Sequence, residues 1–347
     1  MAEVAAGLND LDALADLIRE DSPTLESLVL APDGKYQTRQ LTMSAVHQEV
    51  VDDLAAAFRC RDAGDFPVLY CGWGKARVGS TALNNLFGLA GLPSYYQPIK
   101  ALLRHRLSGS RAPLWHLPAA AAEPCLFSKE VAGPYVLAEC LYIPLRMLVE
   151  AGYPVDKLHL VLLDRHPVDC LSSWYAKWSD RVPRERLLHH HVLASLNVIR
   201  VAAYARRQGI PVTHYVYEAS RDAVTAAGAL FRRLGLAQRF HEDAVTNWKG
   251  LGDLDSDDAK VIYPDEPAAY SVPGLHGADT AYRFHGRGDA TLDADALDVL
   301  ERCGVLETYW DSVRACVADL TLDQRTADRL LSADYRLFPT AFRGSDI

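Results

Sequence analysis

The chain has 347 residues, 49% of them hydrophobic, which is enough to bury one large core together with an extension. Its formal net charge of −9 argues against a broad basic face for nucleic acid, although a local cluster of cations would still bind an anionic ligand. Seven cysteines without paired spacing indicate reduced thiols in a cytoplasmic protein, and the acidic N-terminal segment leads us to expect neither an export signal nor a membrane span.

Residues 1–64 are predicted to form an N-terminal helical extension. Leu8 to Ile18 and Val46 to Phe58 have helical apolar spacing, and a turn-like Ala31-Pro32-Asp33-Gly34 separates them. Three roles are open to such an extension: covering the sheet, forming a dimer contact, and closing over a substrate. A homo-oligomer is therefore compatible with the sequence. Residues 65–347 form the expected main α/β domain.

A glycine-containing loop follows the first predicted strand, Phe66 to Cys71. It reads Gly74-Lys75-Ala76-Arg77-Val78-Gly79-Ser80-Thr81 and leads into a helix with apolar spacing from Leu83 to Ala90. Backbone N–H groups in such a loop, together with the helix N-terminus, bind anions. The Gly-x4-Gly spacing is that of a phosphate loop, but Ser80 stands where nucleoside triphosphatases carry lysine. This departure favours a smaller anion, held by arginine and hydroxyl donors.

Residues 104–124, which include His105 and His116, are predicted to form a loop. The next strand, Leu126 to Val131, contains Lys129 and Glu130. A helix is expected from Val136 to Val149, kinked or ended at Pro144 because proline cannot donate the internal hydrogen bond.

The strand Leu158 to Leu163 is followed by Asp164-Arg165-His166-Pro167. Pro167 suits the first turn of a helix, and Ser173 lies further along the same helix. A phosphate over the end of this strand would accept charge-assisted bonds from Arg165 and a hydroxyl bond from Ser173. An ordinary surface arginine beside the sheet is the alternative.

A long helix from Leu187 to Arg207 is predicted before a strand that runs from Val212 to Glu218 and carries Tyr217. Consecutive histidines on a helix point in different directions, so His189-His190-His191 is expected to lie on a solvated face rather than bind a metal. Trp174, Tyr175 and Trp178 fit the core better than an acceptor pocket, although both readings are open. Residues 242–290 are predicted to be a lid or loop insert, and a mostly helical tail follows Leu292.

Strands alternate with helices, and the candidate ligand motifs fall at the carboxyl ends of strands. This pattern predicts an α/β fold with an open, mainly parallel sheet and helices on both faces.

Together these segments resemble the sulfotransferases that use 3′-phosphoadenosine 5′-phosphosulfate (PAPS). One family signature is (Lys/Arg)-Ser-Gly-(Ser/Thr)-Thr, which Arg77-Val78-Gly79-Ser80-Thr81 matches except at Val78. A second has Arg, one residue, Pro, and Ser eight positions after the Arg, as Arg165, Pro167 and Ser173 have here. The strand end Tyr217-Glu218 and the later Leu234-Gly235-Leu236 are also similar to the family. The resemblance covers residues 65–290 in the family's order.

The resemblance implies a P-loop-type sheet order, PAPS as donor and 3′-phosphoadenosine 5′-phosphate (PAP) as product, without metal. It also implies transfer of the sulfonate to a hydroxyl, or an amine, of a small-molecule acceptor. The residues it assigns to the cofactor are Lys75, Arg77, Val78, Gly79, Ser80 and Thr81 for the phosphosulfate, Arg165 and Ser173 for the 3′-phosphate, and Tyr217 for adenine. For Lys75, a solvated loop charge is an equal alternative. Tyr282 to Gly288 is similar to a late loop over the 3′-phosphate, with a flexible basic turn as the alternative.

The catalytic base does not follow the family pattern. The family strand between the two cofactor motifs carries a lysine and, two residues later, a histidine, but here Lys129 is followed by Val131. Some relatives use a carboxylate, so Glu130 is the expected base, with Lys129 and Arg77 stabilising charge. A surface Glu130–Lys129 pair is the alternative, and His105 and His116 are the fallback bases.

Two other classes of function remain open from the sequence. One is an ATP-dependent P-loop kinase, which Ser80 and the lack of an expected strand ending in a magnesium-binding aspartate disfavour. The other is a non-catalytic nucleotide-binding protein.

Overall fold

Six parallel strands form the central sheet, in the order β7-β6-β3-β5-β4-β8. The computed structural model describes residues 10–248, 261–271, 281–286 and 292–331. The strands are β3 (Val68–Lys75), β4 (Ser94–Tyr96), β5 (Cys125–Ala132), β6 (Leu158–Asp164), β7 (Val212–Val216) and β8 (Val261–Ile262). A separate antiparallel pair is made by β1 (Val29–Leu30) and β2 (Leu41–Thr42). The four predicted strands are all present in the sheet, whereas β4 and β8 were not predicted.

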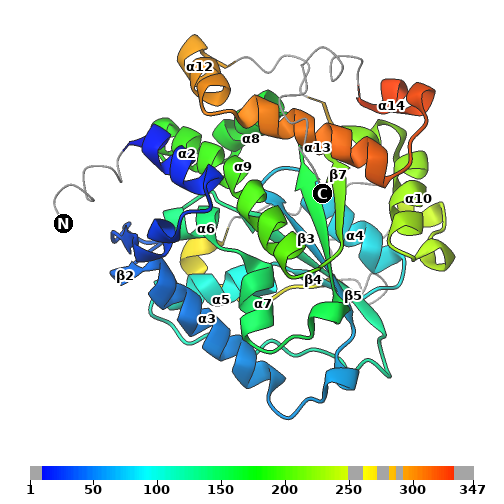
Figure 1. Ribbon diagram of the computed structural model, residues 1–347, viewed down its shortest axis with the longest axis horizontal. Helices are drawn as coiled ribbons and strands as arrows, with labels where there is room; N and C mark the ends of the chain where they lie inside the picture. The colour runs from blue at the N-terminus through cyan, green and yellow to red at the C-terminus, as the bar shows by residue number, and fades with distance from the viewer. Residues whose placement is uncertain (1–9, 249–260, 272–280, 287–291, 332–347) are drawn as a thin grey trace.

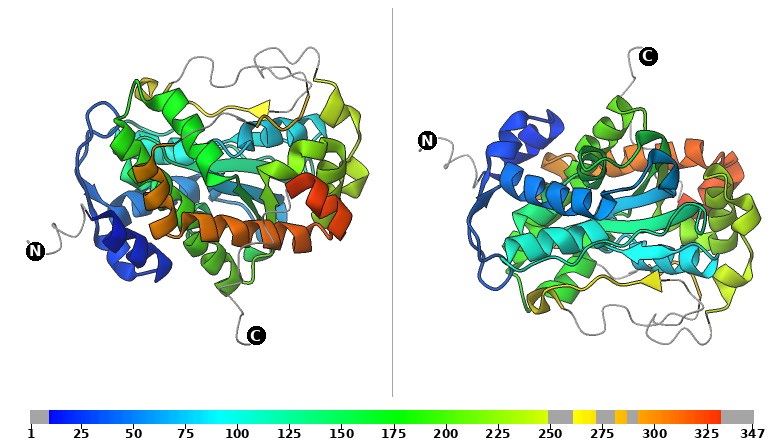
Figure 2. Two further views of the ribbon diagram at one scale, coloured as in Figure 1. Left: turned by 90° about the horizontal axis from the view of Figure 1, so that it is seen from above. Right: turned by 90° about the horizontal axis from the view of Figure 1, so that it is seen from below.

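Helices cover both faces of this sheet, so the predicted open parallel α/β fold is confirmed (Figures 1 and 2). The connection from β3 to β4 runs across the sheet in one direction, whereas the connections from β4 to β5 and from β6 to β7 run in the other. Because crossover connections between parallel strands are right-handed, the helix of the first connection lies on one face of the sheet and the helices of the other two lie on the opposite face. The helices before residue 150 are α2 (Leu11–Arg19), α3 (Met43–Phe58), α4 (Ser80–Leu89), α5 (Pro98–Leu107), α6 (Leu137–Leu141) and α7 (Pro144–Glu150). The later ones are α8 (Pro167–Trp178), α9 (Arg184–Arg207), α10 (Ala223–Arg233), α11 (Asp243–Thr246), α12 (Ala294–Arg302), α13 (Val305–Asp319) and α14 (Gln324–Leu331).

The N-terminal helices belong to the same hydrophobic core as the sheet. In the chain's extension, α2 packs on α9, and α3 packs on α5 and α7. The buried Arg200 of α9 donates to the carboxylate of Asp21 over 3.1 Å, which ties the two parts together. The extension thus thickens the helical layer on one side of the sheet, where Figure 1 shows it in blue. One continuous set of buried apolar side chains includes Leu11, Leu54 and Leu160.

Several local predictions are settled by these elements. The break at Pro144 is confirmed, because α6 ends at Leu141 and Pro144 is the first residue of α7. The predicted loop 104–124 was wrong for its first residues, because α5 continues to Leu107. Tyr217 and Glu218 lie in the 3₁₀ turn Tyr217–Asp222 directly after β7, not in the strand itself.

The prediction that His189 to His191 form a solvated face was also wrong. His190 and His191 are buried, and the imidazole of His191 packs edge-on against Trp174 at 5.2 Å between ring centroids. A nitrogen of His190 donates to the carbonyl of Pro134 over 2.7 Å. Among the described residues, no cluster of three or more histidine, cysteine or acidic side chains could hold a metal ion.

The sheet order brings two loops together at one edge. The chain leaves β3 toward β4 on one side and leaves the adjacent β6 toward β7 on the other, which opens a crevice between the two carboxyl ends. The loop from Ala76 to Gly79 follows β3, and Arg165 follows β6, so both lie beside this crevice. Among the described helices, none is long and apolar enough to cross a membrane. Among the described residues, no cysteine forms a disulfide bond.

Candidate active site

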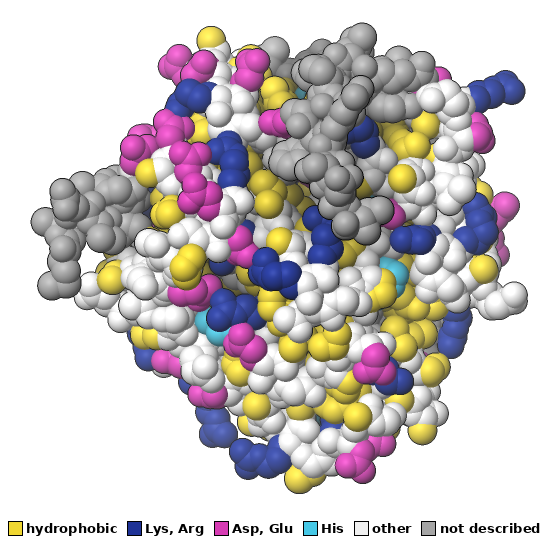
Figure 3. All heavy atoms as spheres, in the orientation of Figure 1, with side chains coloured by type: hydrophobic (Ala, Val, Ile, Leu, Met, Phe, Trp, Pro, Cys, Tyr) yellow, Lys and Arg dark blue, Asp and Glu magenta, His cyan; other side chains and the backbone are white. Residues whose placement is uncertain are grey.

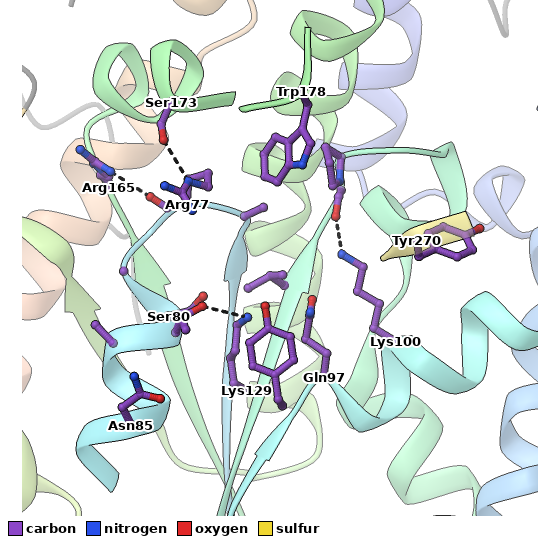
Figure 4. A pocket seen from close by; sticks show the side chains of 18 of the residues that line it. Arg77, Ser80, Asn85, Gln97, Lys100, Lys129, Arg165, Ser173, Trp178 and Tyr270 are labelled. Carbon is purple, nitrogen blue, oxygen red and sulfur yellow. Dashed lines mark hydrogen bonds between the residues drawn. The ribbon is translucent and has the colours of Figure 1, made fainter. Parts of the chain in front are cut away.

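A cavity of about 680 Å³ opens at the carboxyl edge of the sheet (Figure 4). Its walls come from the loop and helix after β3, from the ends of β5 and β6, from α5 and α8, and from the segments 263–271 and 285–286. Part of the predicted lid therefore lies against the cavity. No described residue before Phe66 lines it.

Arg77, Ser173 and Arg165 form a linked cluster at one end of the cavity. Arg77 Nε donates to Ser173 Oγ over 2.9 Å, and Arg165 Nη1 donates to the backbone oxygen of Arg77 over 3.1 Å. Arg165 Nη2 donates to the carbonyl of His285 over 3.1 Å, but its buried Nε has no hydrogen-bond partner. The sequence motifs that lie 88 residues apart (165 − 77) are thus brought into contact.

The loop between β3 and α4 is held in a tight conformation around this cluster. Arg77 and Gly79 both have positive φ angles, +72° and +73°. The carbonyl of Ala76 accepts a hydrogen bond from Trp174 Nε1 over 2.7 Å, which anchors the loop to α8. A Cβ atom on Gly79 would lie 2.2 Å from a ring carbon of Tyr217, so only glycine allows this contact.

Tyr217 forms a side wall of the cavity. The guanidinium of Arg165 stacks on its ring at 4.8 Å, and the ring of Phe284 lies 5.1 Å away. Its hydroxyl donates to the carbonyl of Arg283 over 3.3 Å and accepts from the backbone N–H of His285 over 2.9 Å. The described part of the late loop therefore packs on the same cluster, while Arg287 and Gly288 lie outside the described residues.

Ser80 and Thr81 begin α4 and line the cavity, as does Lys129. The ammonium group of Lys129 donates to Thr81 Oγ1 over 3.4 Å and lies 3.5 Å above the ring of Tyr96. Burial, together with the nearby charge of Lys100, holds the pKa of Lys129 well below its ordinary value. An anion bound beside Thr81 would favour the charged form of this lysine.

Lys75 and Val78 do not line the cavity. Lys75 is buried at the end of β3 and forms an ion pair with Asp164 at the end of β6, which also accepts the backbone N–H of Arg165 over 2.8 Å. The alternative that Lys75 is a solvated loop charge is therefore wrong, because its ion pair with Asp164 links the ends of β3 and β6. A strand does end in an aspartate, but the carboxylate of Asp164 is already engaged by Lys75. Val78 is a buried apolar side chain.

Glu130 lies on the opposite side of β5 from the cavity. Successive side chains of a strand point to opposite faces, so Lys129 and Val131 reach the cavity, whereas Glu130 does not. Its carboxylate accepts the backbone N–H groups of Ile99 over 2.9 Å and Lys100 over 3.1 Å at the start of α5. Burial raises the pKa of Glu130 to about 7. This geometry gives Glu130 a capping role and keeps its carboxylate outside the cavity.

The two fallback histidines also lie outside the cavity lining. The ring nitrogens of His105 pair with Ser110 Oγ at 2.8 Å and with the carbonyl of Asp265 at 3.1 Å. His116 is exposed in the loop that precedes β5. None of the three proton acceptors that the sequence suggested therefore lines the cavity.

The other end of the cavity is built from residues that the sequence did not single out. Lys100 and Arg104 project from α5, and Glu266 and Tyr270 come from the segment after β8. Arg104 donates to Glu139 over 2.6 Å and to both oxygens of Glu266 over 2.9 and 2.8 Å. The signal available in the sequence was the pair of basic residues four apart on a short amphipathic segment, which places both on one helix face.

Aromatic side chains line this end as well. Tyr135 and Tyr270 have ring centroids 5.8 Å apart, and the Arg104 guanidinium lies 4.5 Å above Tyr270. Trp178, for which the sequence favoured the core over a pocket, lines the cavity, whereas Trp174 is buried beneath the loop. The extension backs this wall of the cavity, since Tyr36 stacks behind Tyr135 at 4.4 Å and its backbone oxygen accepts a hydrogen bond from the hydroxyl of Tyr270.

Several buried polar atoms along the cavity lining have no protein partner. Besides Arg165 Nε, they include the side-chain oxygens of Asn85 and Gln97 and the indole nitrogen of Trp178. Such atoms are costly to bury unless something pairs with them.

No protein-family model matches the chain, and no curated protein or solved structure gives a match either.

Proposed function

We propose that the protein transfers a sulfonate group from PAPS to a hydroxyl of a small-molecule acceptor in the cytoplasm. The observation that carries the proposal is the cluster of Arg77, Ser173 and Arg165 at the crevice between β3 and β6, with Arg165 Nε buried and unpaired. A buried guanidinium donor beside a hydroxyl suits a phosphate ester, because charge-assisted bonds are strongest to such oxygens. The motif resemblance supports the same ligand.

In this proposal the two phosphate positions of the donor fall on different parts of the cluster. The N-terminus of α4, with Ser80 and Thr81, faces the 5′-phosphosulfate, and the helix dipole favours that charge. Arg165 and Ser173 bind the 3′-phosphate, and Tyr217 contacts the adenine. On the face in Figure 3, acidic and basic side chains are interspersed, which agrees with a nucleotide as the anionic partner rather than a nucleic acid.

Sulfonate transfer needs in-line geometry and neutralisation of developing charge. The acceptor oxygen forms a bond to sulfur while the bond from sulfur to the 5′-phosphate oxygen breaks and leaves its electron pair on that oxygen. Arg77 and Lys129 lie beside the α4 N-terminus, where they stabilise the charge on the leaving phosphate. The acceptor then occupies the far end of the cavity, near Lys100, Trp178 and Tyr270.

An ATP-dependent kinase is the second candidate, and a specific contact weighs against it. The aspartate that ends β6 is paired with Lys75, so a magnesium ion would have to displace a buried ion pair. A non-catalytic nucleotide-binding protein would use the same cluster but would not need the polar atoms at the far end of the cavity.

Turnover assays separate the three candidates. The protein is incubated with sulfur-labelled PAPS and a panel of phenols, alcohols and amines, and in parallel with labelled ATP and magnesium. Label transfer from PAPS without metal supports the proposal. Transfer from ATP alone would establish the kinase, and tight PAP binding without transfer to any acceptor would favour the binding protein.

A further inference from the structure

The far end of the cavity contains a second lysine whose role the proposed chemistry does not yet assign. Lys100 lies in the first turn of α5, is 1% exposed, and lines the cavity between Gln97 and Tyr270 in Figure 4. Its amine donates a hydrogen bond to the backbone oxygen of Gly133. The opposite wall at this end is formed by Trp178.

We infer that Lys100 is the proton acceptor of the transfer step, and that the sulfonate acceptor is an aromatic hydroxyl whose ring lies beside Tyr135, Tyr270 and Trp178. This inference rests on the proposed function. The hydroxyl proton passes to the lone pair of Lys100 Nζ as the oxygen bonds to sulfur, and the 5′-phosphate oxygen leaves with the electron pair. The proton and the charge are therefore both accounted for without a metal or a further reactant.

The surroundings of Lys100 suit an amine that is neutral part of the time. Its nearest carboxylate, Glu139, is 3.9 Å away and is bound more closely by Arg104 at 2.6 Å, so the lysine shares that negative charge with the arginine. Burial lowers the pKa of Lys100 to about 8, against the opposing pull of Glu139. The charged or titratable groups that act on Lys100 or interact with it are Glu139, Arg104, Glu266, Cys140, Lys129 and Glu130.

The walls favour an aromatic acceptor. Tyr135, Tyr270 and Trp178 surround this end, and aromatic rings pack well on other rings. The unpaired oxygen of Gln97 and indole nitrogen of Trp178 add an acceptor and a donor for polar substituents of the ligand. A phenol loses its proton near pH 10, within reach of an amine base, whereas an alkyl alcohol is far less acidic.

The test compares Lys100→Met and Lys100→Arg with the wild type, using PAPS and 4-methylphenol or the more acidic 4-nitrophenol. Methionine has no lone pair for a proton, and arginine stays protonated, so both variants lower turnover of 4-methylphenol by about 10²–10⁴-fold. Turnover of 4-nitrophenol falls much less, because that acceptor is already ionised. PAP affinity measured by calorimetry stays unchanged. Lys157→Met, at the amino end of β6, is the matched control and keeps full activity.

The pH profile gives a readout that a structural or purely electrostatic lysine would not produce. A base must be neutral, so wild-type turnover rises with pH through a value near 8, and this rise disappears in both variants. A lysine that acts only through its positive charge would instead lose activity as the pH rises. Because this profile is measured on the wild type, it remains decisive if a variant does not fold, and Lys100→Gln then serves as the second substitution.

The outcomes distinguish the inference from the function on which it rests. Wild-type transfer with normal turnover in Lys100→Met, or equal losses for both phenols, overturns the role of Lys100 alone. Transfer to alkyl alcohols or amines but to no phenol overturns the acceptor class. A wild type that does not bind PAP overturns the proposed function itself, and the inference with it.

Discussion

Replacement of Gly79 by alanine tests how the loop and Tyr217 depend on each other. The new Cβ would lie 2.2 and 2.5 Å from two carbons of the Tyr217 ring, closer than such atoms can approach. The ring cannot simply rotate away, because Arg165 stacks on it at 4.8 Å and the backbone of His285 donates to its hydroxyl. The substitution therefore displaces Tyr217 and, with it, Arg165.

The substitution has two free-energy costs, one to folding stability and one to ligand binding. An alanine at a φ angle of +73° costs about 1–2 kcal/mol of folding stability. Under the proposed function, displacement of Arg165 removes at least one charge-assisted hydrogen bond to PAP, worth about 1.5–3 kcal/mol. PAP affinity should then fall by about 10- to 150-fold, on top of the loss of stability.

Gly209→Ala is the matched control. Gly209 has a φ angle of +70°, but nothing lies within 4 Å of the position that its Cβ would take. Urea unfolding should show the backbone cost in both variants, and calorimetry should show the loss of PAP affinity only in Gly79→Ala. Unchanged PAP affinity in a folded Gly79→Ala protein would refute the reasoning.

Three further variants test other parts of the site. Glu130→Gln should keep its turnover, because the carboxylate caps α5. The folded-state pKa of Glu130 is raised from 4.5 to about 7, so the free energy of unfolding of the wild type falls as the pH rises through this range. Urea titrations of the variant should lack that fall in the free energy of unfolding. A collapse of turnover in the variant would instead restore Glu130 as the base. Lys129→Ala should lower kcat by about 10²–10³-fold, measured with labelled PAPS, because the leaving oxygen loses a positive charge; an unchanged kcat would exclude that role. Arg104→Met leaves the buried Glu139 with a weaker partner and should lower the free energy of unfolding, measured in urea, by roughly 3–5 kcal/mol. The exposed control Arg186→Met should lower it by no more than about 1 kcal/mol. Equal losses would contradict a stabilising role for the buried Arg104–Glu139 pair.

The sheet could be predicted from the sequence because buried parallel strands are short apolar runs between helices. Leu158 to Leu163 and Phe66 to Cys71 carry that signal plainly. Strand β4 does not, since its three residues, Ser94 to Tyr96, are polar or aromatic and its place depends on pairing with β5. Because β4 was missed, nothing pointed to the helix after it, which carries Lys100 and Arg104.

The cluster of Arg77, Ser173 and Arg165 was predictable because each half of it belongs to a local sequence motif. Arg77 and Arg165 follow adjacent strands, and the order of the sheet alone brings them together. The base was not predictable in the same way. Side chains alternate between the two faces along β5, so Lys129 and Glu130 cannot enter one cleft. The far wall comes from segments near residues 100, 135 and 270, whose contact no local pattern encodes.

Calorimetric titration with PAP and with adenosine 5′-phosphate, in the absence of metal, tests the central claim most directly. The wild type should bind PAP far more tightly, because Arg165 and Ser173 engage the 3′-phosphate that the second ligand lacks. Arg165→Ala should lose most of this preference, while its affinity for adenosine 5′-phosphate changes little. Equal affinity of the wild type for the two nucleotides would contradict the proposed donor site.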